Sequence, residues 1–158
     1  MSNHAATSRA RDRRGSTGQA LAEFALVAPI FFLLLFGIIE GGRFILFYQT
    51  LNNATREGAR YAIVHGSNSS CPSGPMPPGQ SPPFCYDLAG ANVVQRVKDA
   101  AFGVLGSDVD VTPTWGALGN GREADVTVTA EYTYATLVPL IPLPPITITA
   151  ESRLVINN

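Results

Sequence analysis

Hydrophobic residues form one long uncharged run near the N-terminus of the chain. Fifteen residues from Ala25 to Ile39 carry no charge, and the run reaches nineteen if it starts at Leu21 and Glu23 is tolerated. At a rise of about 1.5 Å per residue, such a helix extends roughly 28 Å, close to the hydrocarbon thickness of a bilayer, about 30 Å. The pattern therefore predicts a membrane-spanning helix.

The helical pattern continues beyond this run but becomes one-sided. Apolar residues recur every three or four positions on one face, and polar residues occupy the other face. The apolar set is Phe44, Phe47, Tyr48, Leu51, Ala54, Gly58 and Ala62, and the polar set is Gln49, Asn52, Asn53, Arg56, Glu57 and Arg60. We therefore expect one continuous helix from about Gln19 to Val64.

A loop rich in Gly, Pro and Ser follows over residues 66–89, and it carries the only two cysteines, Cys71 and Cys85. In an oxidising compartment they can form a disulfide, which would add about 3 kcal/mol of stability in the chain-entropy model. Two free thiols are the alternative. A metal site is disfavoured, because the loop contains no His and no third Cys.

Residues 90–158 combine a helical and a strand pattern. Apolar residues at helical spacing predict a second amphipathic helix from Gly90 to Leu105. Strict alternation then predicts strands around 109–111, over 126–134 and over 146–156, each with one polar face. The fold class is therefore α+β, with a small antiparallel sheet covered on one side by the second helix, by the outer half of the first, or by both.

Two connections of the sheet stand out. Asn120-Gly121 is a candidate tight turn between the first two strands. The connection 136–145 is unusually apolar for a loop. It either packs against a helix or forms a surface for a partner or a membrane.

Charge is low and unevenly distributed. Only 15% of the residues are charged while 46% are hydrophobic, and the net charge is -1. Residues 1–18 carry +3 and the remainder carries -4. The absence of a basic patch beyond this short arm excludes a nucleic-acid binder.

The charge distribution also predicts the topology. The positive-inside rule places the N-terminus in the cytoplasm and residues 41–158 outside. A cleaved secretory signal is the alternative, but no small-x-small site follows the apolar run.

The sequence offers no set of catalytic or cofactor-binding residues. His4 lies in the basic arm and His65 stands alone, so neither a His-based triad nor a metal cluster can be assembled. Asp108, Asp110 and Asp125 alternate onto a polar strand face, which favours a solvated surface over a calcium site. We expect no enzyme activity, no cofactor and no small-molecule substrate.

The entry to the apolar run carries a motif. Gly18 is followed by QALA and then by Glu23-Phe24. A carboxylate in a membrane helix is costly and calls for a reason. The basic arm, the glycine, four residues and a Glu-aromatic pair resemble a type IV prepilin of the Flp/Tad kind. This resemblance implies cleavage by a prepilin peptidase between Gly18 and Gln19, whereas the alternative is that Glu23 only reaches to the lipid headgroups.

The longer run from Gly18 to about His65 resembles the N-terminal region of TadE-like proteins, minor pilins or pseudopilins of the tight-adherence pilus. The resemblance rests on the step from Glu40 to Arg43 and on the segment 54–62, which contains Arg56, Glu57, Gly58 and Arg60. It implies a structural subunit of the bacterial inner membrane or the pilus, with lipid, prepilin peptidase, other pilin subunits and Tad assembly proteins as partners.

Within this region, Gly37 and Gly41 form a small-xxx-small pattern that permits close helix packing, although glycines are also common in membrane helices. Glu40 and Arg43 can pair on one helix face. The expected plan is a leader (1–18), a transmembrane helix with an amphipathic extension (19–65), a loop (66–89) and an extracytoplasmic domain (90–158). The competing function is an uncleaved, membrane-anchored binding or adhesion module that uses the Cys71–Cys85 loop.

Overall fold

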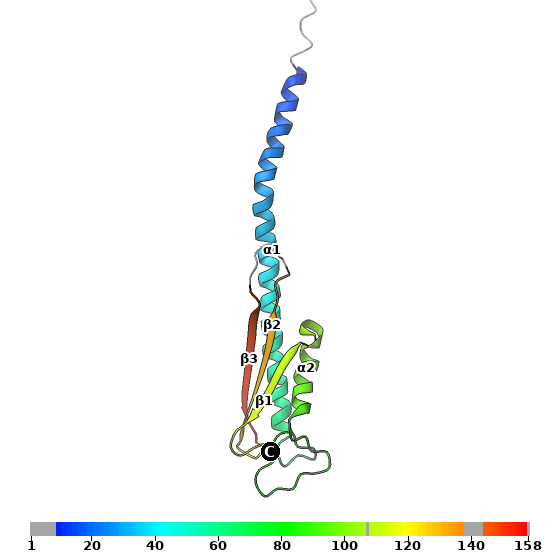
Figure 1. The fold of residues 1–158 in the computed structure, drawn as a ribbon, viewed down its shortest axis with the longest axis vertical. Coiled ribbons are helices and arrows are strands. Elements are labelled where there is room, and N and C mark those ends of the chain that lie inside the picture. Colours follow the sequence, from blue (N-terminus) through cyan, green and yellow to red (C-terminus); the bar gives the residue numbers. More distant parts are fainter. Residues whose placement is uncertain (1–8, 107, 138–143, 158) are drawn as a thin grey trace, which may run out of the picture. The chain divides into compact units, whose positions relative to one another are not determined.

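The computed structural model describes residues 9–106, 108–137 and 144–157, with side chains from Thr17 onward. His4 and the side chains of the leader arginines lie outside this part of the chain. The described elements are α1 (Arg9–Val64), α2 (Ala91–Leu105), β1 (Val109–Trp115), β2 (Asp125–Tyr134) and β3 (Ile146–Val155), as Figure 1 shows. A long N-terminal helix, a second helix and a small antiparallel sheet confirm the predicted α+β class.

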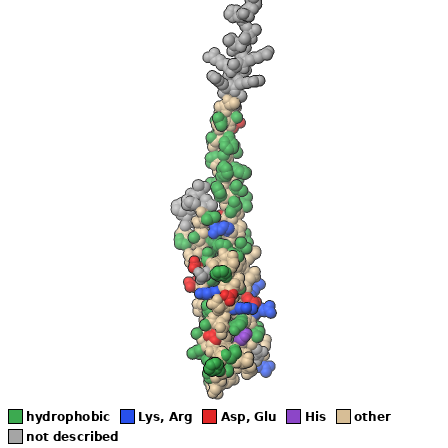
Figure 2. All heavy atoms as spheres, turned by 90° about the vertical axis from the view of Figure 1, so that its right-hand side faces the viewer, with side chains coloured by type: hydrophobic (Ala, Val, Ile, Leu, Met, Phe, Trp, Pro, Cys, Tyr) green, Lys and Arg blue, Asp and Glu red, His purple; other side chains and the backbone are tan. Residues whose placement is uncertain are grey.

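The chain divides into two compact units, Met1–Gly41 and Gly42–Asn158, which we call the N-terminal unit and the C-terminal unit. In the N-terminal unit, hydrophobic side chains cover the surface of α1, as Figure 2 shows, and Leu26 and Ile38 are both 74% exposed. Among the described residues, α1 is the one helix that is long and apolar enough to cross a membrane. It begins at Arg9, earlier than predicted, because Arg and Ala favour helices and no Pro interrupts the segment before Gln19.

The sheet of the C-terminal unit has the strand order β1-β2-β3, with both pairs antiparallel. Along the central strand, Val126, Val128 and Ala130 are buried, whereas Thr127 and Thr129 between them are only partly buried. This alternation confirms the predicted period of two. One face of the sheet is therefore apolar and has to be covered.

Both α1 and α2 cover the apolar face of the sheet. The core combines Leu51, Ala54, Ala59 and Ala62 of α1 with Val93, Val97, Ala101 and Leu105 of α2 and the apolar face of the sheet. At Gly58 the elements come closest, since an added Cβ would lie 2.3 Å from Val97 Cγ2 and 3.6 Å from Val128 Cγ1. A side chain at this position would push the elements apart.

The inward face of α1 is narrower than the sequence pattern suggests. Tyr48, which the pattern places on the apolar face, is 48% exposed. Thr55 is instead fully buried, and its hydroxyl donates hydrogen bonds of 3.2 Å and 2.9 Å to the carbonyls of Leu51 and Asn52. A hydroxyl that hydrogen-bonds to carbonyls of its own helix can be buried in a core without leaving an unpaired polar group. The hydrophobicity pattern therefore does not reveal that Thr55 is buried.

Gly58→Ala is expected to lower the free energy of unfolding by about 1–3 kcal/mol, because overpacking at Val97 exceeds the gain in helix propensity, about 1 kcal/mol. Urea unfolding of the full chain in detergent micelles, followed by the fluorescence of Trp115, measures the change. Gly103→Ala in α2 is the matched control, since its Cβ would meet nothing within 4 Å. The double variant Gly58→Ala/Val97→Ala should lose less free energy of unfolding than the sum of the losses in the two single variants. Losses that simply add would contradict the close contact between the two residues.

Candidate functional site

The residues of the prepilin-like motif lie on the exposed surface of α1. Gly18 and Gln19 are exposed helical residues, and Phe24 is 67% exposed. The Nε2 of Gln19 donates a hydrogen bond of 3.2 Å to Oε1 of Glu23, one turn further along the helix. The expected cleavage position is thus accessible, and Gln19 and Glu23 share one side of the helix.

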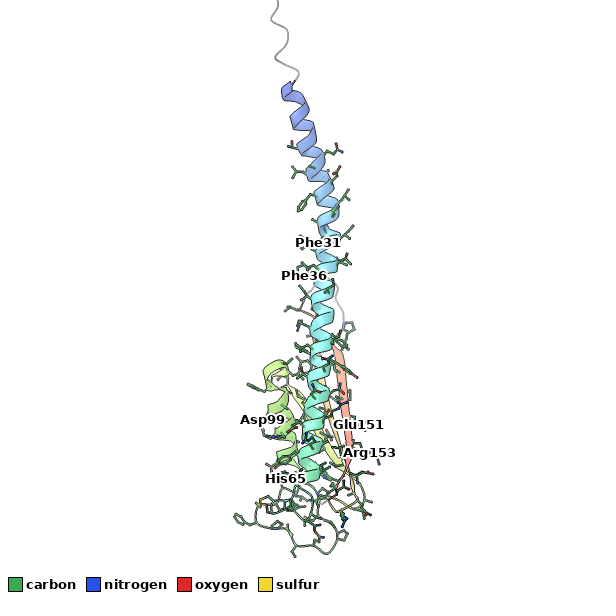
Figure 3. All side chains as sticks on the ribbon, turned by 180° about the vertical axis from the view of Figure 1, so that it is seen from behind. Phe31, Phe36, His65, Asp99, Glu151 and Arg153 are labelled. Atoms are coloured by element: carbon green, nitrogen blue, oxygen red, sulfur yellow. A yellow bond between two sulfur atoms is a disulfide. The ribbon has the colours of Figure 1, made fainter. Side chains whose placement is uncertain are left out.

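The two glycines of the small-xxx-small pattern face open space. A Cβ added at Gly37 or Gly41 would meet no atom within 4 Å. Exposed aromatic rings lie on the same stretch of helix, with the Phe32 and Phe36 rings stacked at a centroid distance of 6.2 Å. Figure 3 shows Phe31 and Phe36 projecting from α1. In the single chain this surface is available for packing against another helix.

The segment 54–62 has two kinds of position in the C-terminal unit. Gly58 is buried, and Oε1 of Glu57 pairs with Nη2 of Arg96 on α2 at 3.3 Å. Arg56 and Arg60 are exposed. The ion pair of Glu57 therefore joins the two helices of this unit.

Arg43 lies over an aromatic cluster at the start of the C-terminal unit. Its Cζ is 5.3 Å from the ring centroids of both Phe47 and Tyr134, which is cation–π geometry. The predicted pairing of Arg43 with Glu40 stays a prediction. The aromatic role of Arg43 was not visible in the sequence, because Tyr134 is distant along the chain.

A polar hollow of about 350 Å³ lies on α1 in the C-terminal unit. Its lining consists of Tyr48, Gln49, Asn52, Asn53 and Arg56. All five belong to α1, so the hollow is a surface feature of one helix rather than an enclosed ligand pocket. Donors and acceptors along one helix face suit contact with another protein surface.

The loop 66–89 is closed by a disulfide between Cys71 and Cys85, as the cysteine spacing predicts. The ring of Trp115 in β1 packs closely on Gly74 within the loop and on Gly90 just after it, since a Cβ added at either glycine would lie 2.3 Å from this ring. Both glycines also have positive φ, 101° and 69°. Only glycine combines this backbone conformation with so close an approach to the indole.

Asp87 fixes the end of this loop to the start of α2. Its carboxylate accepts hydrogen bonds from the backbone N–H groups of Ala91 (2.9 Å) and Asn92 (2.8 Å) and from the hydroxyl of Ser73 (2.8 Å). Partial burial acts to raise the pKa of Asp87, but these bonds, with a further one from the Gly90 N–H, outweigh it and hold the pKa below the ordinary 3.8. Sequence reasoning missed Asp87; an acid shortly before a glycine at a helix start is the available signal.

Asn120 lies in a tight turn closed by a hydrogen bond of 3.2 Å from the Gly121 N–H to the Leu118 carbonyl, within a longer connection between β1 and β2 that extends from Gly116 to Ala124. Asn120 is also fully buried. Its N–H donates to Pro75 O at 2.7 Å, its side-chain amide donates to Ser73 O at 3.3 Å, and its carbonyl accepts from the N–H of Ser67 at 2.9 Å. Asn120 thus ties the strand connection to the disulfide loop.

Within the part of the chain that the structure describes, no group of three His, Cys, Asp or Glu residues could hold a metal ion. His65, labelled in Figure 3, stacks on Tyr61 at a centroid distance of 3.9 Å, and its Nδ1 lies 2.9 Å from the Tyr61 carbonyl oxygen. Asp125 forms an ion pair with Arg153. These side chains therefore have structural partners rather than a shared reactive centre.

The family model described as TadE-like protein matches residues 18–60. This match confirms the predicted resemblance to TadE-like proteins over residues 18–60. No curated protein and no solved structure matches the chain.

The hydrogen bonds of Asp87 make stability depend on pH. Because its folded pKa is lowered, the carboxylate stabilises the fold above the unfolded pKa, and this contribution is lost as the pH falls through the lower folded value. Asp87→Ala should lower the free energy of unfolding at pH 7 by about 0.5–2 kcal/mol, because the backbone N–H groups of Ala91 and Asn92 lose their acceptor. Urea unfolding of the full chain at several pH values should show this deficit shrinking below pH 3.8. A constant deficit across that range would contradict the assignment.

Proposed function

From the TadE-like segment at residues 18–60 we propose that this chain is a minor pilin or pseudopilin, a structural or assembly subunit of a Tad (type IVc) pilus. A structural, non-enzymatic family and an exposed apolar helix that fits a membrane anchor support this function. In the proposed topology the leader is cytoplasmic, α1 crosses the bacterial inner membrane once, and the C-terminal unit lies outside. The observation that carries the proposal is the family match on the helix that also bears the Gly18–Glu23 motif.

Processing after Gly18 is the first step of the proposed function. α1 continues through this position, whereas peptidases bind their substrates in an extended conformation. Gly18 costs about 1 kcal/mol in helix stability relative to Ala, and its site is exposed with no neighbouring atom within 4 Å of an added Cβ. Local unwinding around the scissile bond therefore disturbs no tertiary packing.

Removal of the leader would change the charge balance at the membrane entry. The +3 charge of residues 1–18 is lost, and a new ammonium group forms at Gln19. The Gln19–Glu23 hydrogen bond shows that these residues are within reach of one another on the helix. The ammonium of the same or a neighbouring subunit can then neutralise Glu23 in the low dielectric of a helix bundle, where an unpaired carboxylate is costly.

Assembly would use the surfaces of α1 that its own chain leaves open. In the N-terminal unit these are the open positions at Gly37 and Gly41 and the exposed phenylalanines. In the C-terminal unit the polar hollow with Arg56 supplies hydrogen-bonding groups. Apolar packing in the bilayer and polar contacts outside it give a helix-to-helix interface with a defined register.

An uncleaved adhesion module remains the second candidate function. Phe84 favours it, because this large aromatic side chain is fully exposed beside Cys85 in the disulfide loop. Exposed aromatic residues on a covalently closed loop suit a contact surface. The two functions differ in the fate of the leader.

Expression with and without a prepilin peptidase tests the processing step. The mature chain is expected to begin at Gln19 only when the peptidase is present, as shown by intact mass and N-terminal sequencing of the membrane fraction. Gly18→Val should retain the leader in both samples, and Gly15→Val is the matched glycine control that should still be processed. A parent chain that keeps its leader arginines in both samples would favour the uncleaved module, and one that begins well beyond Ile39 would indicate an exported soluble domain.

Glu23→Ala tests the assembly role. The variant should insert into the membrane as well as the parent chain, because removal of a carboxylate makes the helix more apolar. It should reduce the number of pili counted by electron microscopy, since the proposed partner of the Gln19 ammonium is lost. Glu23→Asp keeps the charge and should recover part of the piliation. Normal pilus numbers in Glu23→Ala would refute the role of this carboxylate in assembly.

A further inference from the structure

Aromatic contacts fix one end of the sheet to the first residues of the C-terminal unit. Tyr134, the last residue of β2, packs edge-to-face against Phe44 and Phe47 of α1, with ring centroids 5.5 Å apart in each pair. Tyr134 is 2% exposed, and its partner in the sheet register is Ile146, the first residue of β3. The end of β2 and the start of β3 therefore lie at the level of these helix residues.

Large hydrophobic side chains are exposed at this same end of the unit. Ile45 and Leu46 of α1 are 56% and 50% exposed, Leu137 after β2 is 68% exposed, and Ile146 is 42% exposed. We name these four residues the apolar collar. They come from three separate segments, so the collar is not a local accident of one helix turn. Exposed apolar residues gathered in this way indicate a surface that is covered in the working protein.

The sequence continuity of α1 indicates what covers the collar. Ile45 follows Ile39, the last residue of the uncharged run, by six positions, which in a helix is a rise of only about 9 Å. The collar thus follows the apolar run at the depth where headgroups replace hydrocarbon. Among its neighbours on α1, Tyr48 and the cationic Arg43 are of the residue types that anchor helices at membrane interfaces.

We propose that the apolar collar lies in the headgroup region of the bilayer that α1 enters, so that the C-terminal unit rests on the membrane surface. This inference depends on the proposed membrane anchoring but on no other part of the proposed function. The sheet then becomes a second attachment to the lipid, through Leu137 and Ile146, beside the helix itself. Residues 138–143 lie outside the described residues and form no part of the collar.

Fluorescence quenching in vesicles tests the docking. The full chain carrying Leu137→Trp is reconstituted in vesicles of phosphatidylethanolamine and phosphatidylglycerol, with or without lipid brominated near the headgroup end of its acyl chains. Leu88→Trp is the control, because Leu88 is 64% exposed but lies away from the collar. Its neighbour Asp87 accepts a hydrogen bond from Ser73, and the N–H of Ser73 donates to the carbonyl of His65, just after the C-terminal end of α1. Both variants also contain Trp115, and its fluorescence is removed by subtracting the spectrum of the parent chain.

The added fluorescence of Leu137→Trp is expected to shift to shorter wavelength and to be largely lost in brominated vesicles, while that of Leu88→Trp is retained. Equal retention in both variants, with the chain still floating with the vesicles, would overturn the docking and leave the anchor intact. A blue shift without quenching would show that protein covers the collar and would also overturn the docking. A chain that fails to float with the vesicles would refute the membrane anchor, and the docking with it.

Discussion

One helix, α1, must satisfy two different environments along its length. From Ala25 to Ile39 α1 carries no charged residue, and from Phe44 onward only one side is apolar. That one side is the surface on which the C-terminal unit is built, since Leu51, Ala54 and Ala62 form its core with α2 and the sheet. Small residues predominate there, and Gly58 lets three elements meet. Without this change of character along α1, neither an anchor nor a folded unit would result.

The motif and family residues separate into two groups by what they contact. Gly58 and Glu57 are engaged within the C-terminal unit, by close packing and by the ion pair with Arg96. Gly18, Phe24, Gly37 and Gly41 are exposed. Residues of the first kind shape the subunit itself, and residues of the second kind are those through which we propose that it is processed and assembled.

Sequence patterns predicted the elements well, because amphipathic periodicity reports burial directly. The three strands and the second helix follow from such local signals, and the pairing of Cys71 with Cys85 follows from their being the only two cysteines. The motif at Gly18 and Glu23 was found by resemblance rather than by periodicity. What the patterns missed depends on distant partners: Asn120 is buried by bonds to the disulfide loop, and Asp87 is held by α2. Polar residues like these are indistinguishable from loop residues until the fold supplies their partners.

The contact between Phe44 and Tyr134 also dictates an order of events during synthesis. The two rings are 90 residues apart in the chain, so the amphipathic part of α1 leaves the ribosome long before the sheet that covers it. Contacts of such long range form late. The nascent chain must therefore pass through a stage in which the anchor is made and its continuation still shows a bare apolar face. In the proposed topology, transport of the rest of the chain precedes folding, and the rate of export then sets how long that apolar face stays exposed.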